Sequence, residues 1–237
     1  MFLSVIIPAY NEEKRITKTL LSVEEYLKRQ PYNYEILVVS DGSTDSTIEV
    51  VSRLKEQISS LRIIDNKKNH GKGFVVRQGM LEAVGDIRLF MDADNSTNID
   101  QVSKFLPYFQ QGYDVVIGSR RAVGSVIVVK QSGLREFLGW VFRLIVRILV
   151  PLGVSDSQAG FKAFSKKTTE AVFAKQTIFR WAFDVEILAI AKKMRFKIKE
   201  TPVVWANDAQ SHVKIGGMIK MFFEVLTVRK NLWSKKY

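Results

Sequence analysis

Asp92 and Asp94 are the residues of this sequence whose type and spacing point most directly to chemistry. They follow residues 87–91, an apolar run that predicts a strand, and residues i and i+2 of an extended chain point to the same side. Two carboxylates placed together repel each other unless a cation lies between them or one of them is protonated. A divalent ion that also binds a diphosphate would relieve this repulsion and neutralise the charge of a departing nucleoside diphosphate. A solvated acidic turn is the alternative interpretation of the same residues.

The composition restricts which metal such a site could hold. The 237 residues include no cysteine and two histidines, which excludes thiolate catalysis, cysteine-based zinc sites and histidine-rich sites. Oxygen ligands favour Mg²⁺ or Mn²⁺. The formal net charge of +12 favours an anionic partner such as a phosphorylated substrate, an acidic lipid or nucleic acid, with general solubility as the alternative. No recognised nucleic-acid-binding motif accompanies the charge, so we expect no nucleic-acid partner.

The elements that would position the aspartates alternate regularly in the first half of the chain. Short apolar, β-rich runs predict strands at residues 3–8, 35–40, 61–65, 87–91 and 115–118. Helical spacing predicts helices at residues 12–30, 45–59, 73–84 and 99–111. This alternation predicts an α/β fold with a mostly parallel sheet flanked by helices. Ligands of such sheets bind beyond the carboxyl ends of the strands, where the polar segments 9–12, 41–43, 69–73 and 92–94 lie.

The rhythm changes after Ser119. We expect helices at residues 134–150, 166–174, 183–194 and 216–233, and extended segments at 160–164 and 196–205, the last broken at Pro202. No linker rich in proline, glycine or serine separates the halves, which favours one continuous domain over residues 1–237. The sequence has no P-loop signature and no Gly-x-Gly-x-x-Gly after the first strand, which disfavours nucleoside triphosphatases and dinucleotide oxidoreductases.

Taken in order, four segments of the first half resemble motifs of the family 2 glycosyltransferases, namely residues 5–12, 38–45, 69–73 and 92–94. Three segments of the second half, 118–120, 156–162 and 180–186, are most similar to the branch that transfers glucose to dolichyl phosphate, with the mannose-transferring branch close behind. The resemblance spans nearly the whole chain. It implies the GT-A fold, with a nucleotide-sugar-binding half over residues 1–118 and an acceptor-binding half over residues 119–237.

The resemblance also implies a reaction. We expect inverting transfer of a hexose from a nucleoside-diphosphate sugar to a polyprenyl phosphate, dolichyl or undecaprenyl, with glucose and UDP-glucose favoured. A GDP-mannose-dependent polyprenyl-phosphate mannosyltransferase and a family member with a soluble or glycan acceptor are the alternatives. Two more distant alternatives are a nucleotidyltransferase and a basic, membrane-associated module that binds nucleotide without turnover. The sequence does not indicate the length of the lipid or the oligomeric state.

On the donor side, the resemblance implies that Asp41 reads the nucleotide base and that Asp92 and Asp94 hold the metal against the diphosphate. The other residues expected around the donor are Pro8, Tyr10, Glu12, Lys72 and Ala93. The sequence departs from the family pattern at Ser40, where the first of two acidic residues is usual, and at His70, where arginine is frequent. The first departure weakens the base-reading assignment, and the second either lowers donor affinity or is a local variant.

On the acceptor side, the residues expected to contact the anionic acceptor or the donor phosphates are Arg120, Arg135 and Lys214. Gln158 and Asp184 would lie near the reacting sugar. The expected catalytic residues are Asp92, Asp94, Arg120, Gln158 and Asp184. Whether Asp184 acts as a base or positions a substrate stays open. Glu186 would project about 200° away from Asp184 on a helix, so we do not expect it to face the site.

Two helices of the second half predict contact with a membrane surface. In residues 134–150, Arg135, Arg143 and Arg147 fall within about 120° on a helical wheel beside a broad apolar face, which is typical of a helix in the membrane interface. A core helix is the equally weighted alternative, and the segment is too short and too charged to span a bilayer. Residues 216–233 also combine apolar and basic side chains. With no signal peptide visible, we expect peripheral attachment to the cytoplasmic face of a membrane.

Overall fold

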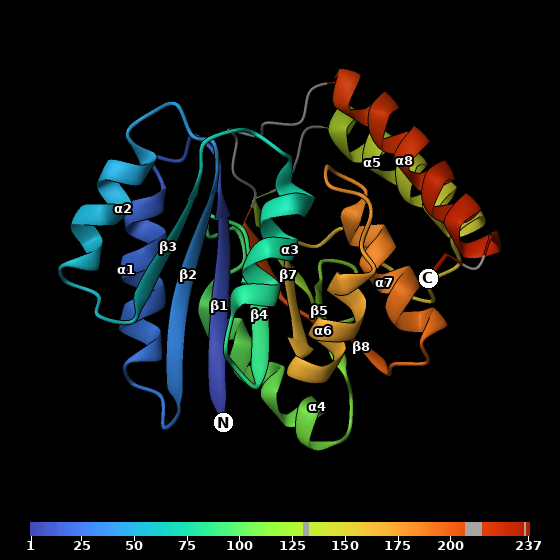
Figure 1. Ribbon diagram of the computed structural model, residues 1–237. Coiled ribbons are helices and arrows are strands. Elements are labelled where there is room, and N and C mark those ends of the chain that lie inside the picture. The colour runs from blue at the N-terminus through green and yellow to red at the C-terminus, as the bar shows by residue number, and fades with distance from the viewer. Residues whose placement is uncertain (130–132, 207–214, 235) are drawn as a thin grey trace.

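The computed structural model describes residues 1–129, 133–206, 215–234 and 236–237. At its centre is a seven-stranded sheet in the order β3-β2-β1-β4-β7-β5-β8 (Figure 1). The strands of this sheet are β1 (Phe2–Ala9), β2 (Asn33–Asp41), β3 (Leu61–Asn66), β4 (Ile87–Met91), β5 (Val115–Ser119), β7 (Phe161–Ser165) and β8 (Ile198–Pro202). Strands β6 (Val126–Val129) and β9 (Val204–Ala206) form a separate parallel pair. The predicted α/β fold with a mostly parallel sheet is confirmed.

Helices cover both faces of the central sheet. They are α1 (Ile16–Leu27), α2 (Thr47–Lys55), α3 (Lys72–Glu82), the 3₁₀ helix η1 (Ile99–Lys104), α4 (Leu106–Gln110), α5 (Gly133–Leu149), α6 (Lys166–Ala174), α7 (Phe183–Lys193) and α8 (Ile215–Trp233). One hydrophobic cluster joins α1, α2 and η1 to the sheet, and a second joins α3, α6 and α7 to it. In β1, Val5 and Ile7 belong to the first cluster and Ile6 to the second, because successive side chains of a strand point to opposite faces.

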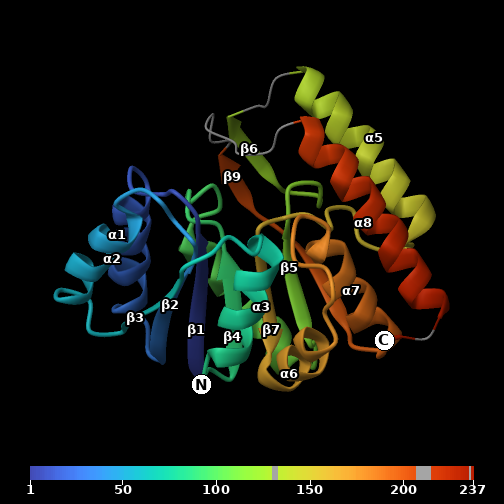
Figure 2. The same cartoon turned by 45° about the horizontal axis from the view of Figure 1, so that its top comes forward.

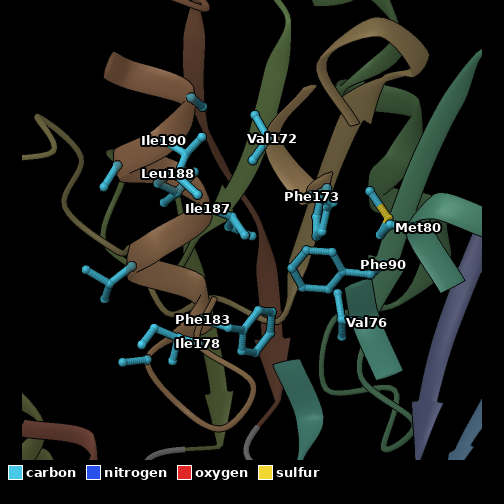
Figure 3. Packing of buried hydrophobic residues seen from close by; sticks show 14 of the residues in the cluster. Val76, Met80, Phe90, Val172, Phe173, Ile178, Phe183, Ile187, Leu188 and Ile190 are labelled. Atoms are coloured by element: carbon cyan, nitrogen blue, oxygen red, sulfur yellow. The ribbon is translucent and has the colours of Figure 1, made fainter. Parts of the chain in front are cut away.

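Aromatic side chains fill the core where α3, β4, α6 and α7 meet, as the convergence of Phe90, Phe173 and Phe183 shows (Figure 3). The ring centroid of Phe90 lies 6.0 Å from that of Phe183, and the centroid of Phe164 lies 5.3 Å from that of Phe173. All four rings are buried. Since Phe183 is the first residue of α7, its burial fixes the start of the helix that carries Asp184.

Strand β7 is the exception to parallel pairing in the central sheet. It lies between β4 and β5 and runs antiparallel to both, with Met91 opposite Phe161 and Ile117 opposite Lys162. The residues that precede β7 therefore stand at the edge where β4 and β5 end. This direction brings the loop of residues 155–160 to the same edge as Asp92, which follows β4.

Two parts of the predicted element pattern differ from the structure. The single helix expected over residues 99–111 is divided into η1 and α4, because Pro107 is compatible with the first turn of a helix but not with its interior. Strand β6 is not predicted from the sequence. All four residues of Val126–Val129 are exposed, so the segment lacks the alternation of a half-buried strand.

Helices α5 and α8 lie side by side at one flank of the molecule (Figures 1 and 2). Their inner faces bury Phe142 and Val146 of α5 and Val225 and Val228 of α8. In the part of the chain that the structure describes, no helix is long and apolar enough to cross a membrane.

Candidate functional site

A pocket opens beyond the carboxyl ends of β4 and β5. Its lining residues are Asp92, Asp94, Ser96, Thr97, Arg120, Gln158, Ala159, Gly160, Val203 and Trp205. Four residues predicted for the site, Asp92, Asp94, Arg120 and Gln158, are therefore brought together in one cavity. The aspartates come from the predicted donor half, and Arg120 and Gln158 come from the predicted acceptor half.

The aspartate pair retains electrostatic repulsion. Asp94 Oδ1 accepts a hydrogen bond from the backbone N–H of Ser96 at 2.9 Å. Burial raises the pKa of Asp94, and the charge of Asp92 raises it further. Ala93 between them is buried, and its carbonyl accepts a hydrogen bond from Thr19 Oγ1 at 2.6 Å, which ties the backbone of the pair to α1. A divalent cation at the pair would relieve the repulsion.

Lys72 places a positive charge beside this pair. It is the first residue of α3, and its Nζ lies 2.5 Å from Asp92 Oδ1. Burial lowers the pKa of Lys72, but the charges of Asp92 and Asp184 outweigh burial and raise the pKa above its usual value. The amine therefore stays protonated and compensates part of the carboxylate charge.

The carboxylates suit a metal that also takes ligands from a substrate. Among the described residues, no group of three or more histidine, aspartate and glutamate side chains is arranged to hold a metal ion. Asp92 and Asp94 offer oxygen atoms at the wall of an open pocket, where phosphate oxygens and water could complete the shell of a divalent ion. These residues fit Mg²⁺ or Mn²⁺ shared with a diphosphate better than they fit a closed structural site.

Asp41, at the end of β2, is engaged by the chain itself. Its carboxylate accepts hydrogen bonds from the backbone N–H groups of His70 at 2.7 Å and Gly71 at 3.0 Å. Burial raises the pKa of Asp41, and these hydrogen bonds oppose the rise. Asp41 thereby fixes the loop ahead of α3. Its contact with a nucleotide base remains a prediction.

The other donor candidates lie at the end of β1. Pro8 is buried within the strand, whereas Tyr10 is 39% exposed just beyond it. Glu12 is buried and pairs with Arg15 at 2.7 Å. Burial raises the pKa of Glu12 against the effect of Arg15, and the charges of the aspartate pair raise it further. Pro8, Tyr10 and Glu12 are not among the residues that line the pocket.

Arg120 is held at the pocket by a buried carboxylate. Its Nε and Nη2 each lie 2.7 Å from an oxygen of Asp156, and its backbone N–H donates to the same side chain. The guanidinium carbon lies 5.3 Å from the ring centroid of Trp205. Burial raises the pKa of Asp156, but the hydrogen bond and charge of Arg120 outweigh burial, so the pKa falls below its usual value. Arg120 is therefore a fixed cation at the pocket wall.

Two further arginines lie within electrostatic range of Arg120, namely its chain neighbour Arg121 and Arg143. Burial lowers the pKa of Arg143 on α5, and the charge of Arg121 lowers it further. The charge of Asp156 opposes this change, and the charge of Arg120 adds to it. Arg121 is only loosely compensated, since its Nη2 lies 4.0 Å from Glu136 Oε1. Guanidinium groups that repel one another would be stabilised by a bound anion, and phosphate matches their hydrogen-bonding geometry.

The remaining residues predicted on the acceptor side are Gln158, Arg135 and Lys214. Gln158 Nε2 lies 3.3 Å from the Sδ atom of Met221, which links this loop to α8. Lys214 and the side chain of Arg135, both predicted to bind phosphate, lie outside the described residues.

Asp184 lies behind the pocket wall rather than in the lining. Its carboxylate accepts a hydrogen bond from Nζ of Lys162, and Asp184 is not among the lining residues. Glu186 projects elsewhere and accepts hydrogen bonds from the backbone N–H groups of Thr177 at 3.0 Å and Ile178 at 2.7 Å. The two acids of α7 therefore separate as the helical spacing predicted.

No role is predicted from the sequence for Asp156, Lys162 or Trp205, although the structure places all three at or behind the pocket. Lys162 has a signal in the sequence, because it is the one charge within the apolar strand Phe161–Ser165 and a buried lysine requires a partner. Trp205 has no comparable signal. It reaches the pocket through the tertiary placement of β9, which local periodicity does not reveal.

Comparisons with known proteins agree on one family. A family model described as Glycosyl transferase family 2 matches residues 4–173. Dolichyl-phosphate beta-glucosyltransferase ALG5C of Trichomonas vaginalis is 34% identical over 250 residues, which cover 100% of this chain and 74% of the relative. The dolichyl-phosphate beta-glucosyltransferase of Homo sapiens is 33% identical over 241 residues, which cover 96% of this chain and 74% of the relative.

Solved structures share the fold at lower sequence identity. Mannosyl-3-phosphoglycerate synthase of Rubrobacter xylanophilus superposes with a TM-score of 0.74 at 17% identity, covering 100% of this chain and 76% of that one. Glucosyl-3-phosphoglycerate synthase of Mycobacterium tuberculosis, in complex with Mn²⁺, UDP and glucosyl-3-phosphoglycerate, gives a TM-score of 0.67 at 18% identity and covers 97% and 79%. These likenesses show the GT-A fold that the sequence predicted.

Proposed function

The chain belongs to glycosyl transferase family 2, and from this premise we propose that it transfers glucose from UDP-glucose to a polyprenyl phosphate with inversion at the anomeric carbon. The observation that carries the proposal is the shared pocket. There, Asp92 and Asp94 line the same cavity as Arg120 and Gln158. The two carboxylates would bind the metal and the donor diphosphate. Arg120 would bind the acceptor phosphate, and the transferred sugar would lie between the two phosphate groups.

The choice of glucose and of a lipid acceptor is supported by the relatives. The curated relatives with about a third identity over nearly the whole chain are dolichyl-phosphate beta-glucosyltransferases. UDP as the nucleotide has weaker support, from a fold neighbour of 18% identity that was crystallised with UDP. GDP-mannose is the alternative donor that an experiment must separate from UDP-glucose.

Asp92 and Asp94 would hold a divalent ion at the donor diphosphate. Fold neighbours crystallised with UDP contain Mn²⁺ or Mg²⁺, and the carboxylate pair here offers the oxygen ligands that either ion prefers. When bound, the ion would neutralise charge that develops on the leaving UDP. Lys72, whose Nζ lies 2.5 Å from Asp92 Oδ1, would hold that carboxylate in place.

In the proposed reaction, an oxygen of the acceptor phosphate attacks the anomeric carbon from the side opposite the UDP. The new carbon–oxygen bond forms as the bond to the diphosphate oxygen breaks, and the electron pair leaves with UDP. A phosphate monoester is already anionic near neutral pH, so the attacking oxygen needs no strong general base. This favours a positioning role for Asp184, whose carboxylate is occupied by Lys162.

Arg120, Arg121 and Arg143 would bind the acceptor phosphate. Arg120 lines the pocket, and the mutual repulsion of the three groups would fall when a dianion lies among them. Arg135 and Lys214 remain predicted contributors on the basis of sequence alone.

The acceptor would approach from a membrane surface. On α5, Phe137, Trp140 and Ile148 are each more than half exposed, and on α8 the same holds for Ile219 and Phe223. These five residues form what we call the outer apolar face of the helix pair. Exposed apolar side chains of this size on adjacent helices, with exposed basic residues on α8, suit the interface of an anionic bilayer. Peripheral attachment to the cytoplasmic face fits the absence of cysteine from the sequence.

The reaction is tested by nucleoside diphosphate release from UDP-glucose, GDP-mannose, UDP-galactose and UDP-N-acetylglucosamine. Each donor is measured with Mn²⁺ or Mg²⁺, with chelator, and with or without a polyprenyl phosphate in detergent. We expect UDP release from UDP-glucose that requires both lipid and metal. Lipid-independent release in the presence of a soluble sugar would support the soluble-acceptor alternative. Pyrophosphate release from a nucleoside triphosphate would support a nucleotidyltransferase.

The membrane surface is tested separately by co-sedimentation with vesicles of phosphatidylcholine and phosphatidylglycerol. We expect the double variant Trp140→Ser, Ile148→Ser to lose most of its vesicle binding while its UDP release in detergent is retained. Leu21→Ser is the matched control, because Leu21 is also exposed but lies on α1. Equal vesicle binding by wild type and the double variant would contradict the assignment of the outer apolar face.

A further inference from the structure

Lys162 is a lysine buried inside the central sheet. It lies in β7, its side chain is fully buried, and its Nζ lies 5.3 Å from the ring centroid of Phe90. Lysine is rarely buried without partners. Burial lowers the pKa of Lys162, and the charge of Asp184 opposes that change. An apolar side chain at this position would form the strand equally well, so strand formation does not explain why a lysine is buried here.

The ammonium group of Lys162 connects two elements next to the site. It donates one hydrogen bond to the carboxylate of Asp184 at the start of α7 and another to the carbonyl of Ala159 in the loop before β7. Ala159 lines the pocket. Lys162 thus links two segments. One is the start of α7, which the sequence resemblance places near the reacting sugar, and the other is the loop that forms part of the pocket wall.

The same loop packs directly against the expected metal ligand. A Cβ on Gly160 would lie 1.9 Å from Asp92 Oδ2 and 2.4 Å from its Cγ, so no side chain fits at this position. The loop is pinned at its other end, where the Glu200 carboxylate accepts hydrogen bonds from the N–H groups of Ser155 and Asp156. Between the hydrogen bonds of Lys162 and those of Glu200, the backbone of Ala159 and Gly160 determines the space available to the Asp92 carboxylate.

We propose that Lys162 is a positioning residue that holds the backbone of Ala159 and Gly160 against Asp92, and so fixes the carboxylate that would bind the metal–diphosphate. This inference rests on the proposed function through the role of Asp92. It differs from a purely structural ion pair in its consequence. A structural pair would affect stability alone, whereas a positioning pair also affects the affinity of the site for a metal–nucleotide complex.

Two variants separate these possibilities. Lys162→Met removes the ammonium and preserves an unbranched side chain of similar length. Arg88→Met is the matched control, because Arg88 is also a buried cation, lies in the adjacent strand β4, and donates to the carbonyls of Met80 and Gly85 at the opposite end of the sheet. Isothermal titration calorimetry with UDP in the presence and absence of Mn²⁺ gives the affinities, and thermal unfolding gives the stabilities.

Both variants are expected to unfold at a lower temperature than wild type. Lys162→Met should weaken binding of the Mn²⁺–UDP complex by roughly tenfold or more and change metal-free UDP binding far less, since the metal ligand is the displaced group. Arg88→Met should bind Mn²⁺–UDP as wild type does. Wild-type affinity in Lys162→Met, or an equal loss in both variants, would overturn the positioning role.

Further outcomes are also distinguishable. If Lys162→Met does not fold, Asp184→Asn tests the same link with the lysine kept, and wild-type Mn²⁺–UDP affinity in that variant would overturn the proposal. No acceptor enters these titrations, so a failure of lipid glucosylation leaves the positioning role standing. If wild type binds neither UDP nor GDP in a metal-dependent way, the metal role of Asp92 falls and the positioning role falls with it.

Discussion

The central sheet buries charged side chains at both of its ends, and the two groups differ in what surrounds them. At the amino end, the carboxylate of Glu35 accepts hydrogen bonds from Ser4 Oγ at 2.6 Å, the backbone N–H of Val84 at 2.8 Å and Arg62 Nη1 at 2.5 Å. Burial raises the pKa of Glu35, but these three hydrogen bonds outweigh burial, so the pKa lies below its usual value. The chain thus compensates the Glu35 carboxylate fully, and the buried Arg88 of the same end donates hydrogen bonds to the carbonyls of Gly85 and Met80.

At the carboxyl end, compensation is incomplete and the charges surround a pocket. Asp94 keeps a raised pKa because of burial and the nearby charge of Asp92. Arg143 keeps a lowered pKa because of burial and the charges of Arg121 and Arg120. A carboxylate that lines the pocket, Asp94, and a guanidinium close to the pocket-lining Arg120, Arg143, are thus each left only partly compensated by the chain. A group that the chain satisfies contributes stability, whereas a group that the chain leaves unsatisfied beside a pocket is available to a ligand.

The largest effect that would sharpen this contrast is expected at the aspartate pair. Asp92→Asn or Asp94→Asn should reduce metal-dependent turnover on the order of a thousandfold, because an amide is a weaker metal ligand and leaves the leaving-group charge less compensated. Steady-state UDP release measures this loss. Asp86→Asn is the control, since Asp86 stands just before the start of the same strand, β4. A variant of the pair with full activity would remove the metal assignment.

A smaller effect, on stability instead of activity, is expected at the amino end. Glu35→Gln should lower the free energy of unfolding by about 2 kcal/mol at pH 7, because a buried carboxylate loses charge-assisted hydrogen bonds. The pKa of Glu35 is lowered in the folded state, so its contribution is present above the unfolded pKa of about 4.3 and is lost as the pH falls through the folded pKa. Urea denaturation from pH 7 to pH 3 should therefore show a difference between wild type and Glu35→Gln that shrinks with acidification.

The activity of Glu35→Gln tests whether the amino end of the sheet contributes to stability without contributing to the site. Per folded molecule, its UDP release and its affinity for metal and nucleotide should equal those of wild type. A large loss of turnover in the folded variant would show that the two ends of the sheet are not separate in function. A stability difference that grew toward acidic pH would contradict the lowered pKa of Glu35.

The smallest of these effects is expected at the arginine group. Arg143→Gln should raise the KM for a polyprenyl phosphate by about tenfold, or roughly 1.4 kcal/mol of binding, and leave kcat nearly unchanged, because uniform binding of the phosphate is lost. Arg53→Gln on the exposed face of α2 is the control. A fall in kcat without a change in KM would mean that Arg143 acts on the transition state and not on acceptor binding.

Local patterns in the sequence predict much of this arrangement. The i, i+2 spacing of Asp92 and Asp94 after an apolar strand correctly places both at one pocket, and α6 has the predicted bounds. The antiparallel direction of β7 cannot be predicted in this way, because a short apolar run has the same appearance in either orientation. That direction carries the loop of residues 155–160 to Asp92. The role of Lys162 depends on it, so the link from the second half to the metal ligand becomes visible in the structure alone.

The central claim, that the carboxyl end of the sheet transfers glucose to a lipid phosphate, is tested most directly by following labelled sugar. UDP-glucose with radiolabelled glucose is incubated with the protein, Mn²⁺ and a polyprenyl phosphate, and the products are partitioned between organic solvent and water. We predict label in the organic phase in equal amount to the UDP released, and a loss of both products on the order of a thousandfold with Asp92→Asn. Release of UDP with all label left in water as free glucose or a soluble glycan would contradict the claim.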